Sequence, residues 1–210
     1  MPIFFQHTVN DSTRIGVWKI EESEGFFKDS VPVHREVSHP HKRLQHLAGR
    51  FLLRYLFPSF PYDLIQIADT RKPYLPNDAF HFSISHCGDF AAVIISPDQR
   101  VGIDIEKPVG KLEALKEKFS TQEERALFPD EGLSNLTLIW SAKETVFKWY
   151  GKGKVDFREH IQLEKYDPVN QQISGFFTKT ELHFEITYTW LEGLAVCWLV
   201  RREARIVNSE

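Results

Sequence analysis

Three carboxylates and one lysine are the side chains of this chain best suited to chemistry on a charged substrate. Asp104 and Glu106 are two residues apart, and Glu144 and Lys148 are four residues apart. Carboxylate oxygens of this kind hold Mg²⁺, and a neighbouring ammonium group can neutralise charge on phosphoryl oxygens. The set therefore indicates metal-assisted chemistry on a phosphate or pyrophosphate.

Each pair also has an ordinary structural interpretation. Residues four apart share one side of a helix, so Glu144 and Lys148 could form a surface ion pair that contributes about 0.2–0.5 kcal/mol. Asp104 and Glu106 could lie at a solvated strand edge, where two neighbouring carboxylates are tolerated. The presence of a third carboxylate and a lysine favours the metal site over both interpretations.

Two elements must position these side chains. The stretch V-G-I-D-I-E-K-P at 101–108 alternates apolar and polar residues as a strand does, so Asp104 and Glu106 share one face. The stretch at 136–150 carries apolar residues at three- and four-residue steps, which predicts a helix that ends at Gly151.

The same patterns predict the other elements. A helix is predicted at 42–57, closed by Pro58, with Arg43 and Arg50 on its polar side. The apolar run at 90–96 predicts a strand buried on both faces. Further strands are predicted at 3–5, 15–20, 80–86, 161–166, 172–179, 182–189 and 194–201, and further helices at 112–119 and 121–128.

A weak internal repeat suggests how these elements are arranged. H-F-S-I-S at 81–85 resembles H-F-E-I-T at 183–187, and a predicted helix precedes each copy. The repeat predicts an α+β fold of two similar halves, residues 1–100 and 101–210. The halves are expected to be related by a pseudo-twofold axis, with the active site in the cleft between them.

Composition narrows the class of protein. The chain has 210 residues, 42% of them hydrophobic, and a net charge of −3, which argues against a strongly basic nucleic-acid binder. Cys87 and Cys197 lack metal-ligand spacing and are expected to be reduced, buried side chains. No signal-peptide pattern and no apolar run of membrane-span length occur, so we expect a cytoplasmic protein that does not bind a membrane.

Four blocks of the sequence resemble the 4'-phosphopantetheinyl transferases, specifically the larger, surfactin-synthetase-activating type. The blocks are R-K-P-Y-L-P at 71–76, F-S-I-S-H at 82–86, V-G-I-D-I-E-K at 101–107 and W-S-A-K-E-T-V-F-K at 140–148. The last two blocks are highly specific as a pair. The resemblance implies coenzyme A as donor, Mg²⁺ as cofactor and a serine of an acyl or peptidyl carrier protein as acceptor.

The resemblance also implies roles for the acidic residues. It makes Asp104, Glu106 and Glu144 the metal ligands, and Lys148 the group that neutralises the coenzyme A pyrophosphate as the bond breaks. We expect Asp104→Ala or Glu144→Ala to abolish transfer and to leave the fold intact, because each substitution removes a repelling carboxylate.

On the donor side, the resemblance places Ser85 and His86 on the 3'-phosphate of coenzyme A, with Lys72 and Pro73 beside the nucleotide. His86 could instead be an ordinary histidine at a strand end.

Two positions depart from the family or have two interpretations. The family often has an arginine in the first long helix where Gln45 stands, so Arg43 or Arg50 is expected to substitute for it. Glu123 stands where the family has a candidate base for the carrier serine. It could equally be the acid of a helix-capping box that begins at Ser120.

These features predict a magnesium-dependent transferase that moves 4'-phosphopantetheine from coenzyme A to a carrier serine and releases adenosine 3',5'-bisphosphate. A metal-dependent hydrolase of nucleotide pyrophosphates and a non-catalytic module that binds coenzyme A or a carrier are the alternatives. One chain that holds both halves can close its own cleft, so a monomer is expected. Fatty-acid, polyketide and peptide synthesis all use such carriers, and the sequence does not distinguish among them.

Overall fold

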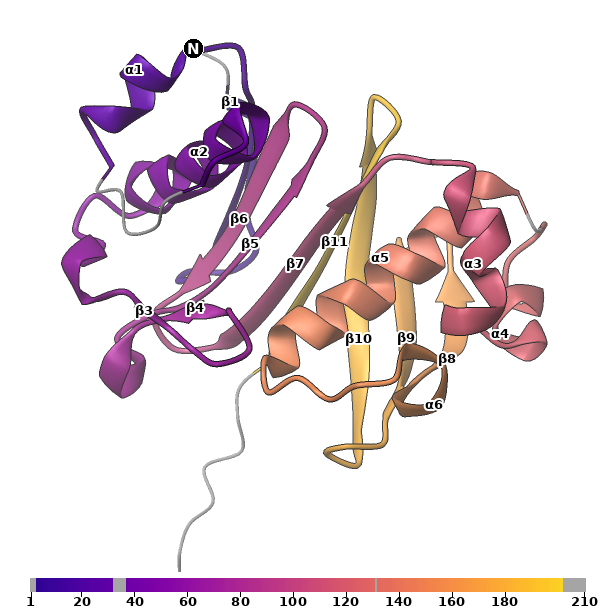
Figure 1. The fold of residues 1–210 in the computed structure, drawn as a ribbon. Coiled ribbons are helices and arrows are strands. Elements are labelled where there is room, and N and C mark those ends of the chain that lie inside the picture. The colour runs from indigo at the N-terminus through magenta and orange to yellow at the C-terminus, as the bar shows by residue number, and fades with distance from the viewer. Residues whose placement is uncertain (1–2, 32–36, 131, 202–210) are drawn as a thin grey trace, which may run out of the picture.

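A computed structural model describes residues 3–31, 37–130 and 132–201. Within these residues the chain forms two main antiparallel sheets and a two-stranded ribbon, with helices on the outside (Figure 1). None of the helices in the described ranges is long and apolar enough to cross a membrane.

The first sheet is built from residues before position 100. Its strands lie in the order β1 (Ile3–Thr8), β2 (Arg14–Lys19), β6 (Phe90–Ser96) and β5 (His81–Cys87). Helix α2 (Pro40–Leu56) packs on one face, and α1 (Glu24–Lys28) packs on α2. A short ribbon, β3 (Gln66–Ile67) and β4 (Pro73–Tyr74), lies between α2 and β5 in the chain, with single 3₁₀ turns at Tyr62–Leu64 and Pro76–Asp78.

The second sheet contains the acidic strand. Its order is β7 (Arg100–Glu106), β11 (Leu194–Arg201), β10 (Leu182–Leu191), β9 (Gln172–Phe177) and β8 (Ile161–Asp167). Helix α5 (Leu133–Tyr150) lies across β7 and β11 (Figure 1). The smaller helices α3 (Lys111–Phe119), α4 (Gln122–Ala126) and α6 (Phe157–His160) border it.

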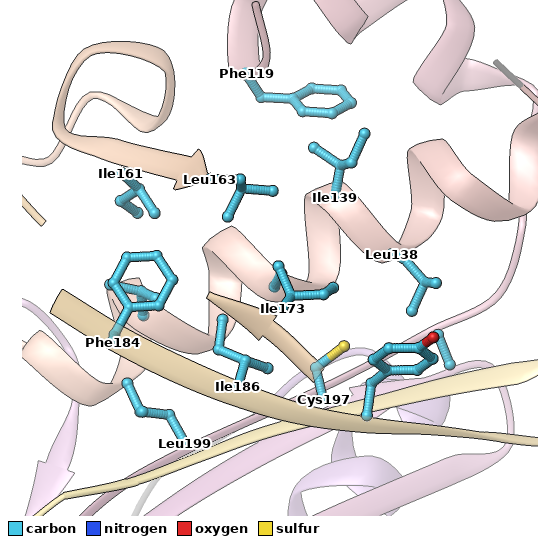
Figure 2. Close-up of a cluster of buried hydrophobic side chains, with 14 of the residues drawn as sticks. Phe119, Leu138, Ile139, Ile161, Leu163, Ile173, Phe184, Ile186, Cys197 and Leu199 are labelled. Atoms are coloured by element: carbon cyan, nitrogen blue, oxygen red, sulfur yellow. The ribbon is translucent and has the colours of Figure 1, made fainter. Parts of the chain in front are cut away.

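Three apolar clusters hold these layers together. One lies between α2 and the first sheet, and another lies between α5 and the second sheet and includes Phe119, Ile139 and Ile186 (Figure 2). The third joins the two sheets and includes Ile94 of β6 and Ile103 of β7. Strand β6 is buried on both faces, as its apolar run predicts, because α2 covers one face and the second sheet covers the other.

Strands β5 and β7 run side by side without forming a backbone ladder. Instead, the Ser83 and Ser85 hydroxyl groups accept hydrogen bonds from the backbone N–H groups of Ile103 and Ile105, at 3.2 and 3.3 Å. Serine side chains therefore supply polar contacts along the seam between the sheets, where they face the acidic strand.

The predicted elements are largely present, and the mixed α and β composition is confirmed. The order β2, β6, β5 in the first sheet has a counterpart in the order β7, β11, β10 of the second sheet. In the chain, α2 follows β2 and precedes β5 and β6, and α5 likewise follows β7 and precedes β10 and β11. The pseudo-twofold axis and the division at residue 100 stay predictions. Helices α1 and α6 and the β3–β4 ribbon were not expected, because each is too short for a periodic pattern.

Gly102 determines how closely α5 approaches β7. An added methyl group at this position would lie 2.4 Å from the Thr145 carbonyl oxygen and 2.9 Å from the Trp149 Cβ atom. We expect Gly102→Ala to lower the free energy of unfolding by about 1–3 kcal/mol, because the helix must move away from the strand. Chemical denaturation measures this loss.

Gly110→Ala is the matched control. Gly110 has a helix-like φ of −55° and no atom within 4 Å of an added methyl group. Its substitution should leave the stability unchanged or raise it by about 0.4–1 kcal/mol. Equal effects at the two glycines would contradict the close packing of α5 on β7.

Candidate functional site

Asp104 is the centre of a buried polar network at the seam. The residue is 2% exposed. One carboxylate oxygen accepts from Lys148 Nζ at 2.6 Å and from Ser85 Oγ at 2.8 Å, and the other accepts from Ser141 Oγ at 2.8 Å. Lys148 Nζ also donates to Ser85 Oγ at 2.7 Å. Strands of both sheets and helix α5 therefore meet at one carboxylate.

The helical spacing of α5 explains this arrangement. Ser141, Glu144 and Lys148 are three and four residues apart, so they share the face of α5 that lies toward β7. Ser141 was not among the predicted site residues, although the same spacing could have revealed it. The alternative interpretation, a surface ion pair between Glu144 and Lys148, does not hold, because Lys148 pairs with Asp104 on the neighbouring strand.

The other two carboxylates are half-buried beside this network. Burial and the negative charge of Asp104 raise the pKa of Glu106, whereas hydrogen bonds with the Trp140 and Cys87 side chains oppose that shift. Burial, Asp104 and Glu106 together raise the pKa of Glu144 to about 7, and only the charge of Lys148 counteracts them. Three carboxylates thus share one ammonium group, and the cluster carries excess negative charge.

The donor set fits a hard divalent cation in its chemistry. Carboxylate oxygens from Asp104, Glu106 and Glu144 are the ligands that Mg²⁺ prefers, and a cation would relieve their mutual repulsion. In the described ranges, however, no three His, Cys, Asp or Glu side chains are already arranged around a common metal position. Asp104 is engaged by Lys148 and two serines, so ligation by all three carboxylates needs a local rearrangement of these side chains.

Ser85 and His86 point to opposite sides of β5, as neighbouring strand residues do. Ser85 is buried and directs its hydroxyl group to Asp104, so the expected contact of Ser85 with a phosphate is not supported by its geometry. His86 is exposed at the end of β5. Although His86 is open to solvent, partial desolvation of its ring and the charge of Lys148 lower its pKa, and Lys42 adds to this effect. Lys42, in the first turn of α2, was not predicted as a site residue.

A groove lies next to this cluster, between the β3–β4 ribbon, β5 and the end of α5. It has a volume of about 210 Å³, and a second hollow of about 270 Å³ adjoins it across Lys72 and Gly151. Lys72 and Pro73 line both, together with Phe82. The ammonium group of Lys72 does not point freely into the groove, because it donates to the backbone carbonyl of Lys148.

The expected phosphate contacts of Arg43 and Arg50 do not agree with their surroundings. Arg43 is held by Glu24 at 2.6 Å and by the carbonyl groups of Val37 and Ser38. Arg50 is 2% exposed, and burial lowers its pKa to about 10. Its Nε and Nη1 atoms have no hydrogen-bond partner among the described residues.

Gln45, the residue at the position of the missing arginine, is also buried. Its Nε2 atom donates to the carbonyl of Gly88 at 2.8 Å, so it fixes the turn between β5 and β6.

The capping prediction for Glu123 is wrong by one residue. The capping box of α4 is formed by Thr121 and Glu124, and Ser120 ends α3 instead. Glu124 is buried and accepts from Lys143 Nζ at 2.6 and 2.8 Å. This pair ties α4 to α5 and leaves Glu123 exposed in the first turn of α4. None of the contacts described for Glu123 brings it to the carboxylate cluster.

Comparison with known proteins identifies the part of the chain that carries this cluster. Residues 100–200 match the 4'-phosphopantetheinyl transferase superfamily. The matched range runs from β7 to β11, and it includes Asp104, Glu106, Glu144 and Lys148.

Individual relatives match over 56% to 64% of the chain. Enterobactin synthase component D of Escherichia coli K12 is 34% identical over 126 residues, which cover 56% of this chain and 60% of that protein. The L-aminoadipate-semialdehyde dehydrogenase-phosphopantetheinyl transferase of Mus musculus is 31% identical over 157 residues, or 64% of this chain and 50% of that protein. The matched regions thus span between half and three fifths of these relatives' length.

The raised pKa of Glu144 predicts a pH-dependent stability. A carboxyl group with a pKa near 4.5 when unfolded and about 7 when folded binds more protons in the folded state between these values. The free energy of unfolding therefore falls as the pH rises from 4.5 to 7. Glu144→Gln has no carboxyl group to ionise and so lacks this loss. Without metal, its free energy of unfolding should exceed that of the wild type by roughly 1–3 kcal/mol above pH 7 and should equal it below pH 4.5.

Asp104→Ala provides the contrast and corrects the expectation that it would leave the fold intact. The substitution removes the acceptor of the Lys148 ammonium group and of the Ser85 and Ser141 hydroxyl groups at the seam. A loss of roughly 2–4 kcal/mol at pH 7.5 is expected, less than for a fully buried pair because Lys148 is 23% exposed. Denaturation curves of both variants across pH test this. A Glu144→Gln difference that does not vary with pH would contradict the assignment.

Proposed function

We propose that this protein is a magnesium-dependent 4'-phosphopantetheinyl transferase of the larger, two-unit type. It would transfer 4'-phosphopantetheine from coenzyme A to a serine of an acyl or peptidyl carrier protein and release adenosine 3',5'-bisphosphate. The observation that carries the proposal is the cluster of three carboxylates and Lys148 beside a groove, within the range that matches the superfamily.

The groove offers the donor molecule an apolar lining next to Lys148. Phe82, Ile84 and Phe147, together with Pro73, give it apolar surface for the nucleotide or the pantetheine arm. His86 and Lys42 carry the hydrogen-bond donor and the positive charge that would meet the 3'-phosphate at the start of α2. Lys42 thereby takes the role first expected of Arg43 or Arg50.

Lys148 is the residue proposed to act on the pyrophosphate. Its ammonium group is already partly desolvated against Asp104, so it can exchange a carboxylate oxygen for a phosphoryl oxygen without first shedding a full hydration shell. In that position it neutralises the charge that develops as the phosphoryl bond to the leaving group breaks. Ser85 and Ser141 keep Asp104 in place while this exchange occurs.

Asp104, Glu106 and Glu144 would hold Mg²⁺. When bound, the ion would withdraw charge from the pyrophosphate and favour attack by the carrier serine. Glu123 stays a prediction as the base for that serine. Its exposed position in α4 allows a docked carrier to reach it.

An assay with coenzyme A, Mg²⁺ and apo carrier protein tests the proposal. We expect a gain in carrier mass by one phosphopantetheine group, which mass spectrometry measures, and no gain when Mg²⁺ is chelated. Glu144→Gln should lower the rate about 100-fold or more, because it removes a metal ligand without removing a structural contact. Glu181→Gln, an exposed carboxylate in the β9–β10 turn, is the control that should keep full activity.

Other outcomes of this assay distinguish the rival functions. Turnover of coenzyme A that does not need the carrier would identify a nucleotide pyrophosphate hydrolase. Binding of coenzyme A without any turnover would identify a non-catalytic module. Tests of carriers from fatty-acid, polyketide and peptide synthesis would then determine which class is the acceptor.

The proposed contact of His86 makes a separate prediction. His86→Ala should raise the KM for coenzyme A about tenfold and leave the KM for 3'-dephospho-coenzyme A nearly unchanged, because only the first donor has the phosphate that loses a partner. Steady-state kinetics with both donors measures this. An equal increase for the two donors would mean that His86 has a structural role.

The monomeric state and the cytoplasmic location of the protein also stay predictions.

A further inference from the structure

The end of helix α5 that carries Lys148 needs hydrogen-bond donors from outside the helix. The last four carbonyl groups of a helix have no backbone donor within that helix. Because α5 ends at Tyr150 and Gly151 turns the chain with a φ of 68°, the carbonyl of Lys148 is one of these groups. The residue whose ammonium group is proposed to act on the substrate thus needs a donor for its own backbone.

Lys72 supplies that donor from a different part of the chain. Its ammonium group donates to the Lys148 carbonyl, and the Thr70 hydroxyl group donates to the Gly151 carbonyl at 3.1 Å. A cation at this place also interacts favourably with the negative end of the helix dipole. In Figure 1 the loop between β3 and β4 reaches the same end of α5.

The contact is closely packed. A methyl group added at Gly151 would lie 2.7 Å from the Lys72 Cδ atom and 2.9 Å from its Nζ atom, so the lysine side chain would have to shift if Gly151 carried a side chain. Burial lowers the pKa of Lys72 to about 8, with a smaller contribution from Arg100. The Lys72 side chain is therefore enclosed against the helix end and is not a freely solvated cation at the groove rim.

The loop that carries Lys72 is itself fixed. Gln66 pairs with Tyr74 and Ile67 with Pro73 in the ribbon. The Ala68 N–H group donates to the Lys72 carbonyl at 2.9 Å, which closes the loop. Because the loop is fixed in this way, it can hold the end of α5 in one position.

We propose that Lys72 is a positioning residue, which fixes the last turn of α5 and thereby the reach of Lys148 to Asp104 and Ser85. Its effect on catalysis rests on the proposed function, whereas its effect on the helix does not. This assignment replaces the expectation that the Lys72 ammonium group binds the nucleotide. The groove wall beside Lys72 remains available to bind the nucleotide.

Lys72→Met is the direct test, because it keeps the length of the side chain and removes only the ammonium group. Hydrogen exchange of the substrate-free protein should become faster in the segment 144–151, where the helix end loses its donor. With coenzyme A, Mg²⁺ and carrier, kcat should fall about tenfold or more while the KM for coenzyme A changes less than about twofold. Lys179→Met, an exposed lysine in the β9–β10 turn, should alter neither quantity.

Thr70→Val keeps the test decisive if Lys72→Met does not fold. It removes the second hydrogen bond to the same helix end from an exposed side chain, so it should produce the same two changes to a smaller extent. Circular dichroism establishes that each variant is folded before exchange and kinetics are compared.

Two results separate the possible failures. Unchanged exchange in segment 144–151, or a raised KM with an unchanged kcat, would overturn the positioning role and make Lys72 a ligand of the donor. An inactive wild-type protein would refute the proposed function, and in that case faster exchange in Lys72→Met would still support the contact between the loop and α5.

Discussion

The structure depends on one buried carboxylate. Asp104 lies where the two sheets and helix α5 meet, and burying its charge is tolerated only because Lys148 and two serine hydroxyl groups donate to it. Ser85 comes from the first sheet, whereas Ser141 and Lys148 come from α5. The contacts that join the parts of the chain are therefore the same contacts that assemble the candidate site.

Strand β7 makes this possible because its two faces have opposite character. The apolar face, with Val101, Ile103 and Ile105, packs against the first sheet and joins the molecule through the hydrophobic effect. The other face carries Gly102, which admits α5, and then Asp104. The alternation of a strand thus places a large apolar interface and a polar network on opposite sides of seven residues.

The negative charge of the site is only partly neutralised by the protein itself. Lys148 neutralises Asp104, but Glu106 and Glu144 remain half-buried with raised pKa values. Natural proteins tolerate such repulsion mainly where a ligand relieves it, and strongly shifted groups cluster at functional sites for this reason. The stability that the folded protein loses here would be recovered when a cation binds, since binding to the folded state alone stabilises it.

The sequence by itself determined most of the elements and which residues form the acidic cluster. Period-two and helical patterns located β7, α5 and the doubly buried β6, and the spacing of Asp104, Glu106, Glu144 and Lys148 identified the acidic site. The tertiary structure decided which groups pair. Lys148 bonds to Asp104, Glu124 replaces Glu123 in the capping box, and Lys72 closes a helix end far along the chain. Residue spacing limits contacts within one element, whereas contacts between elements depend on packing across the whole chain.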